Sequence, residues 1–351
     1  MPPTPKYKGD KMTIRMNLGE NSYDIIVERG IIASADKHFN LNRRALIVTD
    51  TGVPEEYSRT VASLCKEPLI VTVPQGEGSK SVTGLTTLLS AMLGGGFSRR
   101  DCVVAVGGGV VGDLAGFAAS TYMRGIDFYN IPTTLLSQID SSIGGKTAIN
   151  FDGVKNIVGA FYQPKAVLID PNLLKTLPKR QISNGLAEAV KVALTSDSEL
   201  FEIFETKNVE DNLDEIIIRS LIVKKNVVEQ DEKEAGLRQV LNFGHTLGHG
   251  IEASVATSEL YHGECVALGM IPMCAPEIRK RVIDVLKRCG LYRTVSYDWQ
   301  KIKDAAFHDK KADGRCVTVI TVDSVGAFEM KEIKCDTFIE DARTCLEELR
   351  I

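Results

Sequence analysis

The stretch Cys102-Val103-Val104-Ala105-Val106-Gly107-Gly108-Gly109-Val110-Val111-Gly112-Asp113 decides the fold of this chain. Its first five residues form a short apolar run, which is typical of a buried strand in a parallel sheet. Glycines at 107, 109 and 112 then match the spacing G-x-G-x-x-G, and a helix is predicted over 113–121. In this setting the glycines let the backbone approach a pyrophosphate, whose charge favours a helix N-terminus. A tight turn without a ligand is the alternative.

Strand and helix patterns alternate on both sides of this stretch. Further strands are predicted at 44–50, at 68–73, from 128 onward and at 165–170. A helix is predicted over 82–95, and the alternation of apolar and polar residues over 12–30 predicts a hairpin with Asn21 near its middle. Alternating strands and helices imply a parallel sheet with helices on both faces. We therefore expect a Rossmann-like α/β domain over residues 1–177.

One element of a dinucleotide site is not evident in this half. A ribose-binding acid is expected at the end of the strand after the glycine turn, but Asp127 lies before that strand. Asp50 or Glu77, which lie at the ends of other strands, could take this role. The segment Gly144-Gly145-Lys146 is not a P-loop, because it lacks the required glycine spacing.

Beyond Pro178 the periodicity becomes almost entirely helical. Helices are predicted over 180–194, 198–206, 212–229, 240–256, 262–280, 281–290 and 336–350, with a strand-like segment at 316–322. Pro272 and Pro276 could bend or split the fifth of these helices. We expect an all-helical domain over residues 178–351.

Three of the five histidines lie close together in this half, at His245, His249 and His262. His245 and His249 are four positions apart, so a helix places both imidazoles on one face. Two histidines and one glutamate suit a catalytic zinc with an open position, and Glu188 upstream supplies the carboxylate. Histidines that cap or pack a helix are the alternative.

Small residues surround the histidines. They are Gly244, Gly248, Gly250 and Gly263. Each lowers helix propensity by about 1 kcal/mol. Packing alone gives no reason for them in the sequence, so they favour the close approach of a ligand.

Glu188 and Lys191 are three positions apart in a predicted helix that is otherwise apolar from 186 to 194. They would share one face. Burial of a carboxylate and an ammonium is unfavourable unless they are paired or bind a ligand. A surface ion pair of little energetic value is the alternative. Taken alone, Lys224 and Arg238 are interpreted as solvated charges.

Composition narrows the class of protein. The 351 residues are enough for two domains with a large core. A net charge of −4 argues against bulk attraction to nucleic acid or membrane, and no apolar run approaches the length of a membrane span. The eight cysteines form no Cys-x2-Cys pair, which indicates neither a zinc ribbon nor a disulfide framework. Residues 1–6 lack the apolar core of a signal peptide, so the expected location is the cytoplasm.

A series of short motifs links the two halves. They are Gly-Gly-Gly-Val-Val-Gly-Asp at 107–113, Ile-Pro-Thr-Thr-Leu-Leu at 131–136, Asp-Ser-Ser-Ile-Gly-Gly-Lys at 140–146, Lys-Asn at 155–156, Glu-x-x-Lys at 188–191, Leu-Asn-Phe-Gly-His-Thr-Leu-Gly-His at 241–249 and His-Gly-Glu at 262–264. In order and spacing they resemble the 3-dehydroquinate synthase family, over about residues 44–330. The resemblance implies a Rossmann-like parallel-sheet domain followed by an all-helical metal-binding domain. It also implies a homodimer that binds NAD and one Zn²⁺, or Co²⁺ in some members.

The resemblance assigns roles to particular residues. The implied metal ligands are Glu188, His245 and His262, so His249 becomes a substrate contact instead of a ligand. The implied NAD contacts are Glu77, Lys80, Gly108, Gly109, Val110, Gly112, Asp113, Thr133, Thr134, Asp140, Lys146, Lys155 and Thr176. The implied catalytic and substrate residues are Asp140, Lys146, Asn156, Lys191, Lys224, Arg238, Asn242, His249 and Lys310, with Arg124 from a neighbouring subunit. Gln75 stands where the family often has Asp, which weakens the expected first loop contact.

The implied reaction converts 3-deoxy-D-arabino-heptulosonate 7-phosphate to 3-dehydroquinate and phosphate, in the shikimate pathway to chorismate and the aromatic amino acids. Transient oxidation by NAD, β-elimination of phosphate, return of the hydride and aldol closure make up this reaction. Lys224 and Arg238 match the family's carboxylate-binding pair, and Glu234 and His249 are expected to tune neighbouring groups. The alternatives are valiolone, inosose or amino-dehydroquinate cyclases and a metal-dependent polyol dehydrogenase of the glycerol dehydrogenase type.

Overall fold

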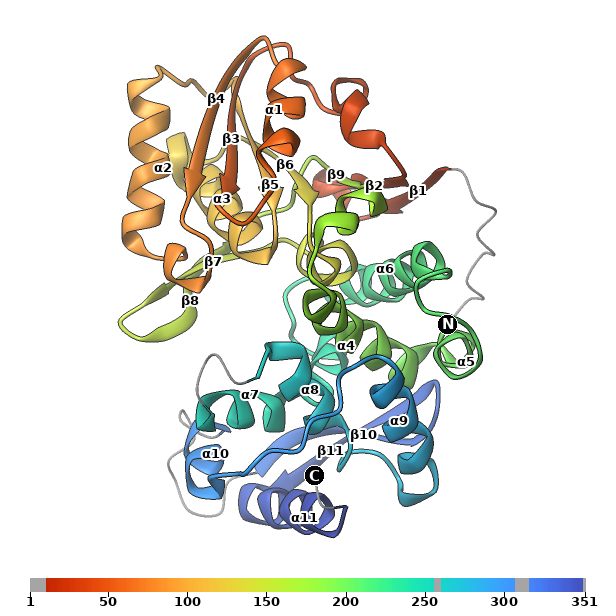
Figure 1. Ribbon diagram of the computed structural model, residues 1–351. Helices are drawn as coiled ribbons and strands as arrows, with labels where there is room; N and C mark the ends of the chain where they lie inside the picture. Colours follow the sequence, from red (N-terminus) through yellow and green to blue (C-terminus); the bar gives the residue numbers. More distant parts are fainter. Residues whose placement is uncertain (1–10, 256–259, 307–315, 350–351) are drawn as a thin grey trace. The chain divides into compact units, whose positions relative to one another are not determined.

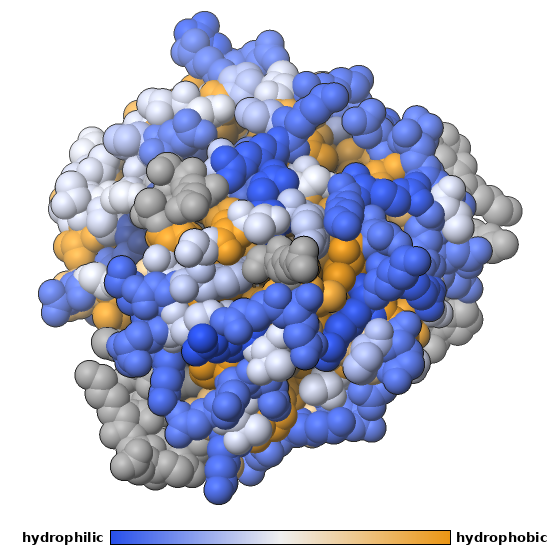
Figure 2. All heavy atoms as spheres, turned by 60° about the horizontal axis from the view of Figure 1, so that its bottom comes forward, coloured by the Kyte–Doolittle hydropathy of each residue, from blue (hydrophilic) through white to orange (hydrophobic). Residues whose placement is uncertain are grey.

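The computed structural model of this chain describes residues 11–255, 260–306 and 316–349. The chain divides into two compact units, the first ending at Pro178 and the second beginning at Lys179 (Figure 1). Within the described residues, no helix combines the length and the apolarity that crossing a membrane requires. The face drawn in Figure 2 is mainly hydrophilic, with hydrophobic residues in small groups between polar ones.

A seven-stranded sheet forms the centre of the first unit, in the order β1-β2-β9-β6-β5-β3-β4. The strands are β1 (Lys11–Met16), β2 (Tyr23–Glu28), β3 (Arg44–Asp50), β4 (Glu67–Val73), β5 (Cys102–Gly107), β6 (Asp127–Pro132) and β9 (Ala166–Ile169). β1 and β2 form the expected antiparallel hairpin, and every other neighbouring pair is parallel. The predicted parallel sheet of Rossmann type is confirmed.

Helices cover this sheet because its central strands bury side chains on both faces. They are α1 (Glu55–Ser63), α2 (Val82–Gly94) and α3 (Gly109–Thr121) (Figure 1). In β5, Cys102, Val104 and Val106 belong to one apolar core, whereas Val103 and Ala105 belong to another. Side chains alternate between the two faces of a strand. The continuous apolar run of β5 therefore supplies both cores.

α3 starts directly after β5, earlier than the predicted start at 113. Gly108 is the extended residue before the helix, with φ −77° and ψ −170°. Gly109 and Gly112 lie in the first turn of the helix. Their low helix propensity, about 1 kcal/mol each, hides the helix start from pattern analysis. The glycine turn leads into a helix N-terminus, as a dinucleotide site requires.

The first unit also contains an antiparallel hairpin that the sequence pattern did not predict. It consists of β7 (Lys146–Phe151) and β8 (Val154–Phe161). Asp152 and Gly153 connect the strands with positive φ values of 49° and 78°. An Asp-Gly pair in this conformation is typical of a two-residue hairpin turn. The Asp152-Gly153 pair was therefore the feature of the sequence from which this hairpin could have been predicted.

The second unit is built mainly of helices. They are α4 (Lys179–Ser196), α5 (Ser198–Thr206), α6 (Leu213–Gln230), α7 (His245–Ser254), α8 (His262–Met270), α9 (Pro276–Arg288), α10 (Trp299–Ala306) and α11 (Cys335–Glu348). The strand-like segment at 316–322 is β10 (Cys316–Ser324), which pairs with β11 (Ala327–Lys334). The helical character of this unit is confirmed, with one hairpin added to it.

Two predicted helices of this unit are divided differently in the structure. Instead of a helix over 240–256, a 3-10 turn at Leu237–Asn242 precedes α7, and Gly244 between them has φ +76°. The predicted boundary between 280 and 281 is wrong, because α8 ends at Met270 and α9 begins at Pro276. The intervening backbone pairs with β10, since Ala275 N–H donates to the carbonyl of Val322 at 2.9 Å. Proline is favoured in the first turn of a helix.

Candidate metal centre and cofactor-binding residues

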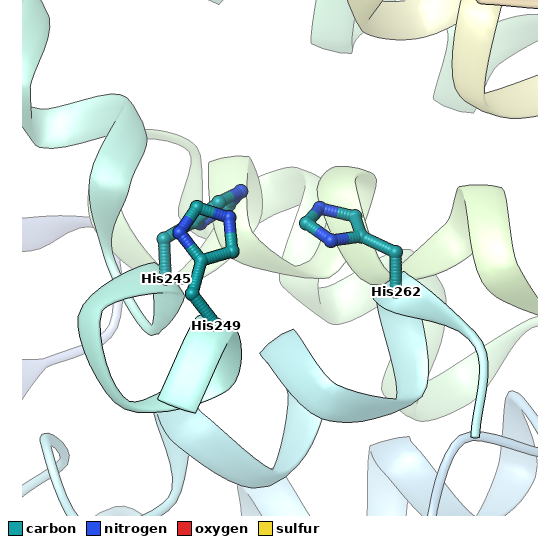
Figure 3. A group of neighbouring side chains, drawn as sticks. All are labelled: His245, His249 and His262. Atoms are coloured by element: carbon teal, nitrogen blue, oxygen red, sulfur yellow. The ribbon is translucent and has the colours of Figure 1, made fainter. Parts of the chain in front are cut away.

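His245, His249 and His262 lie together at the start of two helices. His245 begins α7, His249 follows one turn later, and His262 begins α8. Their ring nitrogens lie within 4.8 Å of one another, and Figure 3 shows the three imidazoles gathered between the two helices. The alternative that these histidines only cap or pack a helix does not account for this convergence.

Glycines allow α7 and α8 to pack closely enough for this arrangement. A Cβ atom at Gly248 would stand 3.0 Å from Cα of Val266, and one at Gly269 would stand 2.1 Å from the carbonyl oxygen of Gly244. Gly250 packs in the same way against Ile302, where a Cβ would stand 2.8 Å from a methyl group. The expectation that packing gives no reason for these glycines is therefore wrong. They position the histidines by close helix–helix contact.

α4 brings Glu188 to the same place. Asn184, one turn before Glu188, accepts a hydrogen bond from the backbone N–H of Gly263 at 2.6 Å. Oε1 of Glu188 lies 3.3 Å from Nε2 of His245 and 3.9 Å from Nε2 of His262. The structure therefore brings the three predicted metal ligands close together, although they come from three different helices.

Glu188 is a buried carboxylate with unusual surroundings. It is 3% exposed and forms an ion pair with Lys191, which is equally buried. Lys191 also donates to the carbonyl of Leu241 at 2.7 Å. These contacts are close, yet neither Glu188 oxygen accepts a hydrogen bond of normal geometry from any described residue. The alternative of a surface ion pair is wrong.

Charge keeps Glu188 ionised. Burial acts to raise the pKa of this carboxyl, but Lys191 and His245 outweigh it and hold the pKa well below its ordinary value. Burial of an ionised carboxylate without properly directed hydrogen bonds is unfavourable, and a bound cation would stabilise it.

The distances fit a metal ion. Tetrahedral ligands about 2.1 Å from zinc stand roughly 3.4 Å from one another, close to the two Glu188–histidine distances. Nδ1 of His245 lies 3.1 Å from the carbonyl oxygen of Phe243, and Nδ1 of His262 lies 2.9 Å from Oε2 of Glu252. Both partners accept hydrogen bonds, so both Nδ1 atoms donate. With the proton on Nδ1, each Nε2 can offer its lone pair to a cation held beside Glu188.

Glu252 contacts the candidate centre, and the sequence pattern did not identify it. Burial acts to lower the pKa of His262, but the hydrogen bond to Glu252 and the charge of Glu188 outweigh it and raise the pKa. A glutamate on an amphipathic helix is normally predicted to be a surface residue. Its spacing from His262 along the sequence is not one that would predict a contact within a single helix. Its role becomes visible only once α7 and α8 are packed.

Glu264 anchors the first turn of α8 and was also missed. It is fully buried and accepts hydrogen bonds from Arg180 at 3.0 and 2.8 Å and from the backbone N–H of Tyr261 at 2.9 Å. It also forms an ion pair with Arg293 at 2.8 Å. Burial acts to raise the pKa of Glu264, and the hydrogen bond from Arg180 leads the contacts that lower it below its ordinary value. The Glu of the His-Gly-Glu motif therefore holds His262 in place.

The predicted substrate cations of this unit are buried. Lys224, on α6, is 5% exposed, and Arg238, in the 3-10 turn that packs against α6, is 2% exposed. Their interpretation as solvated charges is wrong. Asn242 donates to Oε1 of Glu234 at 3.3 Å, which links two more of the predicted residues. Lys310 lies outside the described residues.

In the first unit, the glycine turn lies beside the start of the segment after β6. Thr133 N–H donates to the carbonyl of Gly107 at 2.9 Å, and a Cβ at Gly108 would stand 3.0 Å from the methyl group of Thr134. A Cβ at Gly112 would stand 3.2 Å from Nδ2 of Asn130. Gly112 therefore serves close packing of α3 on β6, while Gly108 and Gly109 shape the turn.

A second cluster joins predicted cofactor and substrate residues. Lys80 is 4% exposed, and its Nζ lies 2.6 Å from Oδ2 of Asp113 and 3.7 Å from Oε1 of Glu77. It also donates to Oδ1 of Asn156, which has a left-handed φ of 58°. Asp50, the other candidate for binding a ribose, is turned inward, and its Oδ1 accepts from Gly52 N–H at 2.7 Å. Glu77 is therefore the better placed of the two acids.

The remaining predicted residues of the first unit lie on several different elements. Asp140 lies in a π-helical turn at Ser137–Ser141, and Asp113 and Lys146 line the same small pocket. Lys155 is exposed on β8, and Oγ1 of exposed Thr176 lies 3.0 Å from the hydroxyl of Tyr57. Val110 follows Gly109 in α3, and Arg124 is exposed after that helix with φ +69°.

A parallel sheet with a glycine-rich strand–helix turn, followed by a helical unit with a carboxylate–histidine centre, defines a class of dinucleotide-fold, metal-binding α/β proteins. Residues 70–184 match the family model "3-dehydroquinate synthase N-terminal", and residues 185–312 match "3-dehydroquinate synthase C-terminal". The 3-dehydroquinate synthase of Pelobacter propionicus is 40% identical over 336 residues, which cover 89% of this chain and 94% of that protein. That of Campylobacter concisus is 39% identical, with 95% and 99% covered. This chain belongs to the 3-dehydroquinate synthase family of enzymes.

Solved structures agree in fold. The 2-epi-5-epi-valiolone synthase of Streptomyces hygroscopicus, with NAD+ and Zn2+ bound, has a TM-score of 0.82 and 29% identity, with 95% of this chain and 99% of that chain covered. A 2-deoxy-scyllo-inosose synthase complexed with carbaglucose-6-phosphate, NAD+ and Co2+ has a TM-score of 0.84 and 24% identity, with 95% and 100% covered. A probable glycerol dehydrogenase from Sinorhizobium meliloti has a TM-score of 0.60 and 16% identity, with 93% and 97% covered. At such low identity the last two show a shared fold alone.

Proposed function

We propose that this chain is a carbon–oxygen lyase that converts 3-deoxy-D-arabino-heptulosonate 7-phosphate to 3-dehydroquinate and phosphate, in the shikimate pathway. Its cofactors are NAD and one divalent ion, Zn²⁺ or Co²⁺. The observation that carries this proposal is the buried Glu188 carboxylate between the Nε2 atoms of His245 and His262, in a chain of this family.

The three ligands would hold the ion with a position left for substrate. When bound, such an ion acidifies hydroxyl oxygens of the substrate. Lys191 keeps Glu188 ionised, and the contacts of both Nδ1 atoms orient the imidazoles. The protein therefore supplies a preorganised ligand set, which lowers the cost of reorganisation during reaction.

In the first unit, the glycine turn and the Lys80 cluster would hold NAD. When bound, NAD supplies a reversible hydride acceptor. The N-terminus of α3 favours the pyrophosphate. Glu77, exposed beside Lys80, is placed to accept from a ribose hydroxyl.

Lys224 and Arg238 would bind the substrate carboxylate, since a guanidinium can grip a carboxylate at two points. Substrates of valiolone and inosose synthases lack that carboxylate, which favours dehydroquinate formation. Lys146, Asn156, Asn242, His249 and Lys310 would contact the phosphate. Asp140 would hold a reacting hydroxyl, and His249 would hold a proton near the leaving phosphate.

Arg124 would reach the site from a second subunit of a homodimer. Met123 and Arg124 are adjacent residues with positive φ values of 48° and 69°. Such backbone conformations cost about 1–3 kcal/mol each and cluster at functional sites. Mixing Arg124→Ala with His245→Ala should restore activity that neither variant has alone. No recovery in mixed dimers would show that Arg124 does not act from the second subunit.

The first test is phosphate release from 3-deoxy-D-arabino-heptulosonate 7-phosphate with catalytic NAD, before and after chelation and return of zinc. We expect release without net NADH, loss with chelator and recovery with zinc. Net NADH from glycerol would indicate a polyol dehydrogenase instead. Release only from sedoheptulose 7-phosphate or glucose 6-phosphate would show that the carboxylate assignment is wrong.

A further inference from the structure

His262 is oriented from both sides of its ring. Its Nδ1 lies 2.9 Å from Oε2 of Glu252, and its Nε2 faces Oε1 of Glu188 at 3.9 Å. The two nitrogens of an imidazole point in different directions, so both contacts can be met by one ring orientation. One side of the ring is therefore held while the other is presented to the proposed metal position.

Glu252 comes from the same helix as the other two histidines. It lies three residues after His249 and seven after His245 on α7, which places all three on one stripe of that helix. His262 belongs to α8. The Glu252–His262 contact is therefore a polar link between two helices that both carry groups of the centre.

The two ligating histidines are held differently. Nδ1 of His245 donates to a backbone carbonyl, that of Phe243, at 3.1 Å. Nδ1 of His262 donates to a side-chain carboxylate at 2.9 Å. A charged acceptor gives a stronger hydrogen bond than a neutral carbonyl, and it also raises the basicity of the ring. The effect of Glu252 can thus be removed by substitution, which is impossible for the carbonyl.

We propose that Glu252 is a positioning residue that sets the metal affinity of this centre. Its carboxylate keeps the His262 proton on Nδ1 and leaves the Nε2 lone pair directed at the ion. Without it, the ring can rotate, or the proton can occupy Nε2 and block ligation. Glu264 holds the backbone of His262 through the start of α8, but it does not determine the ring tautomer.

This inference rests on the proposed function, because it requires that Glu188, His245 and His262 bind a metal ion. An alternative role for Glu252 is purely structural, as a polar bridge between α7 and α8. The two roles differ in what they change. A bridge affects the unfolding temperature, whereas a positioning residue affects the metal affinity and the electronic environment of the bound ion.

The test uses the full chain, stripped of metal, with Glu252→Gln, Glu252→Ala and Glu252→Asp variants. Glu277→Gln is the matched control, because Glu277 is an exposed glutamate in the first turn of α9. Zn²⁺ and Co²⁺ dissociation constants are measured by competition with a chromophoric chelator. The visible absorption of the Co²⁺ forms and the unfolding temperatures of the metal-free proteins are recorded as well.

We expect Glu252→Ala and Glu252→Gln to weaken binding of both ions about 10- to 100-fold. The Co²⁺ absorption should shift, with Glu252→Asp intermediate and the control like wild type. Wild-type affinity and an unchanged Co²⁺ spectrum in Glu252→Gln, which keeps the shape of the side chain, would overturn the inference. Absence of metal binding in wild type would overturn the proposed function, and this inference with it.

Discussion

The backbone N–H of Gly263 donates to Oδ1 of Asn184 at 2.6 Å, and this contact joins the helices that carry His262 and Glu188. A side chain at Gly263 would stand 2.2 Å from the carbonyl oxygen of Asn184. The separation of His262 and Glu188, the two proposed ligands, is therefore set by a contact between Gly263, one residue after His262, and Asn184, one helical turn before Glu188.

Gly263→Ala should separate α4 from α8. Because the atom it meets is backbone, the helix must shift, and overpacking of this kind costs about 1–3 kcal/mol. Zinc affinity should fall with stability. Urea unfolding and zinc titration measure both. Gly94→Ala is the control, since a Cβ at Gly94 in α2 meets nothing within 4 Å and alanine favours a helix. Equal stability of Gly263→Ala and wild type would contradict the packing argument.

Glu188→Gln should abolish zinc binding and activity. It also removes the charge that compensates buried Lys191, and breaking a buried ion pair costs about 3–5 kcal/mol. A Glu188→Gln/Lys191→Met double variant should recover much of that stability, because no uncompensated charge remains, but should still bind no zinc. Metal content and urea unfolding distinguish the two effects. A single variant that retains zinc would exclude Glu188 as a ligand.

Glu264→Gln should destabilise the second unit in a pH-dependent manner. The pKa of Glu264 is lowered in the folded protein, because the contacts led by Arg180 outweigh burial. Its ionisation therefore stabilises the fold above the unfolded pKa of about 4.3, and this contribution is lost as pH falls through the lower folded pKa. Charged hydrogen bonds contribute about 1.5–3 kcal/mol.

The difference between wild type and Glu264→Gln in urea unfolding should be full near neutral pH and shrink under acid. Glu56→Gln serves as the control, because Glu56 is exposed in the first turn of α1. Such surface changes are within about 0.5 kcal/mol. A difference independent of pH would show that the charge of Glu264 contributes nothing.

Lys80→Met should weaken NAD binding and leave zinc affinity unchanged. Lys80 contacts Asp113 and Asn156 in the first unit, whereas the proposed metal ligands belong to the second. A loss of at least about tenfold, or 1.4 kcal/mol, is expected. Calorimetric titration of NAD and of zinc into the same variant measures both affinities. For His245→Ala we expect weakened zinc binding and an unchanged affinity for NAD. Weakened zinc binding in Lys80→Met would show that the Lys80 cluster affects the metal centre.

Local patterns were sufficient for much of the fold. The apolar run of β5 and the glycines after it predicted a buried strand and a helix N-terminus, because both depend on neighbours in the chain. The four-residue spacing of His245 and His249 placed them on one helical face for the same reason. Where propensity was weak, as at Gly109 and Gly112, the helix boundary was misplaced.

Tertiary structure alone decided how the centre is assembled. The sequence by itself determined a parallel-sheet unit, a helical unit and the residue types able to bind a metal. It could not show that Glu252 faces His262, that Lys80 joins Asp113 to Asn156, or that the glycines near the histidines serve packing. These contacts join residues from different elements, and their distances follow from how closely the helices and strands pack. Periodicity within one element carries no information about that distance.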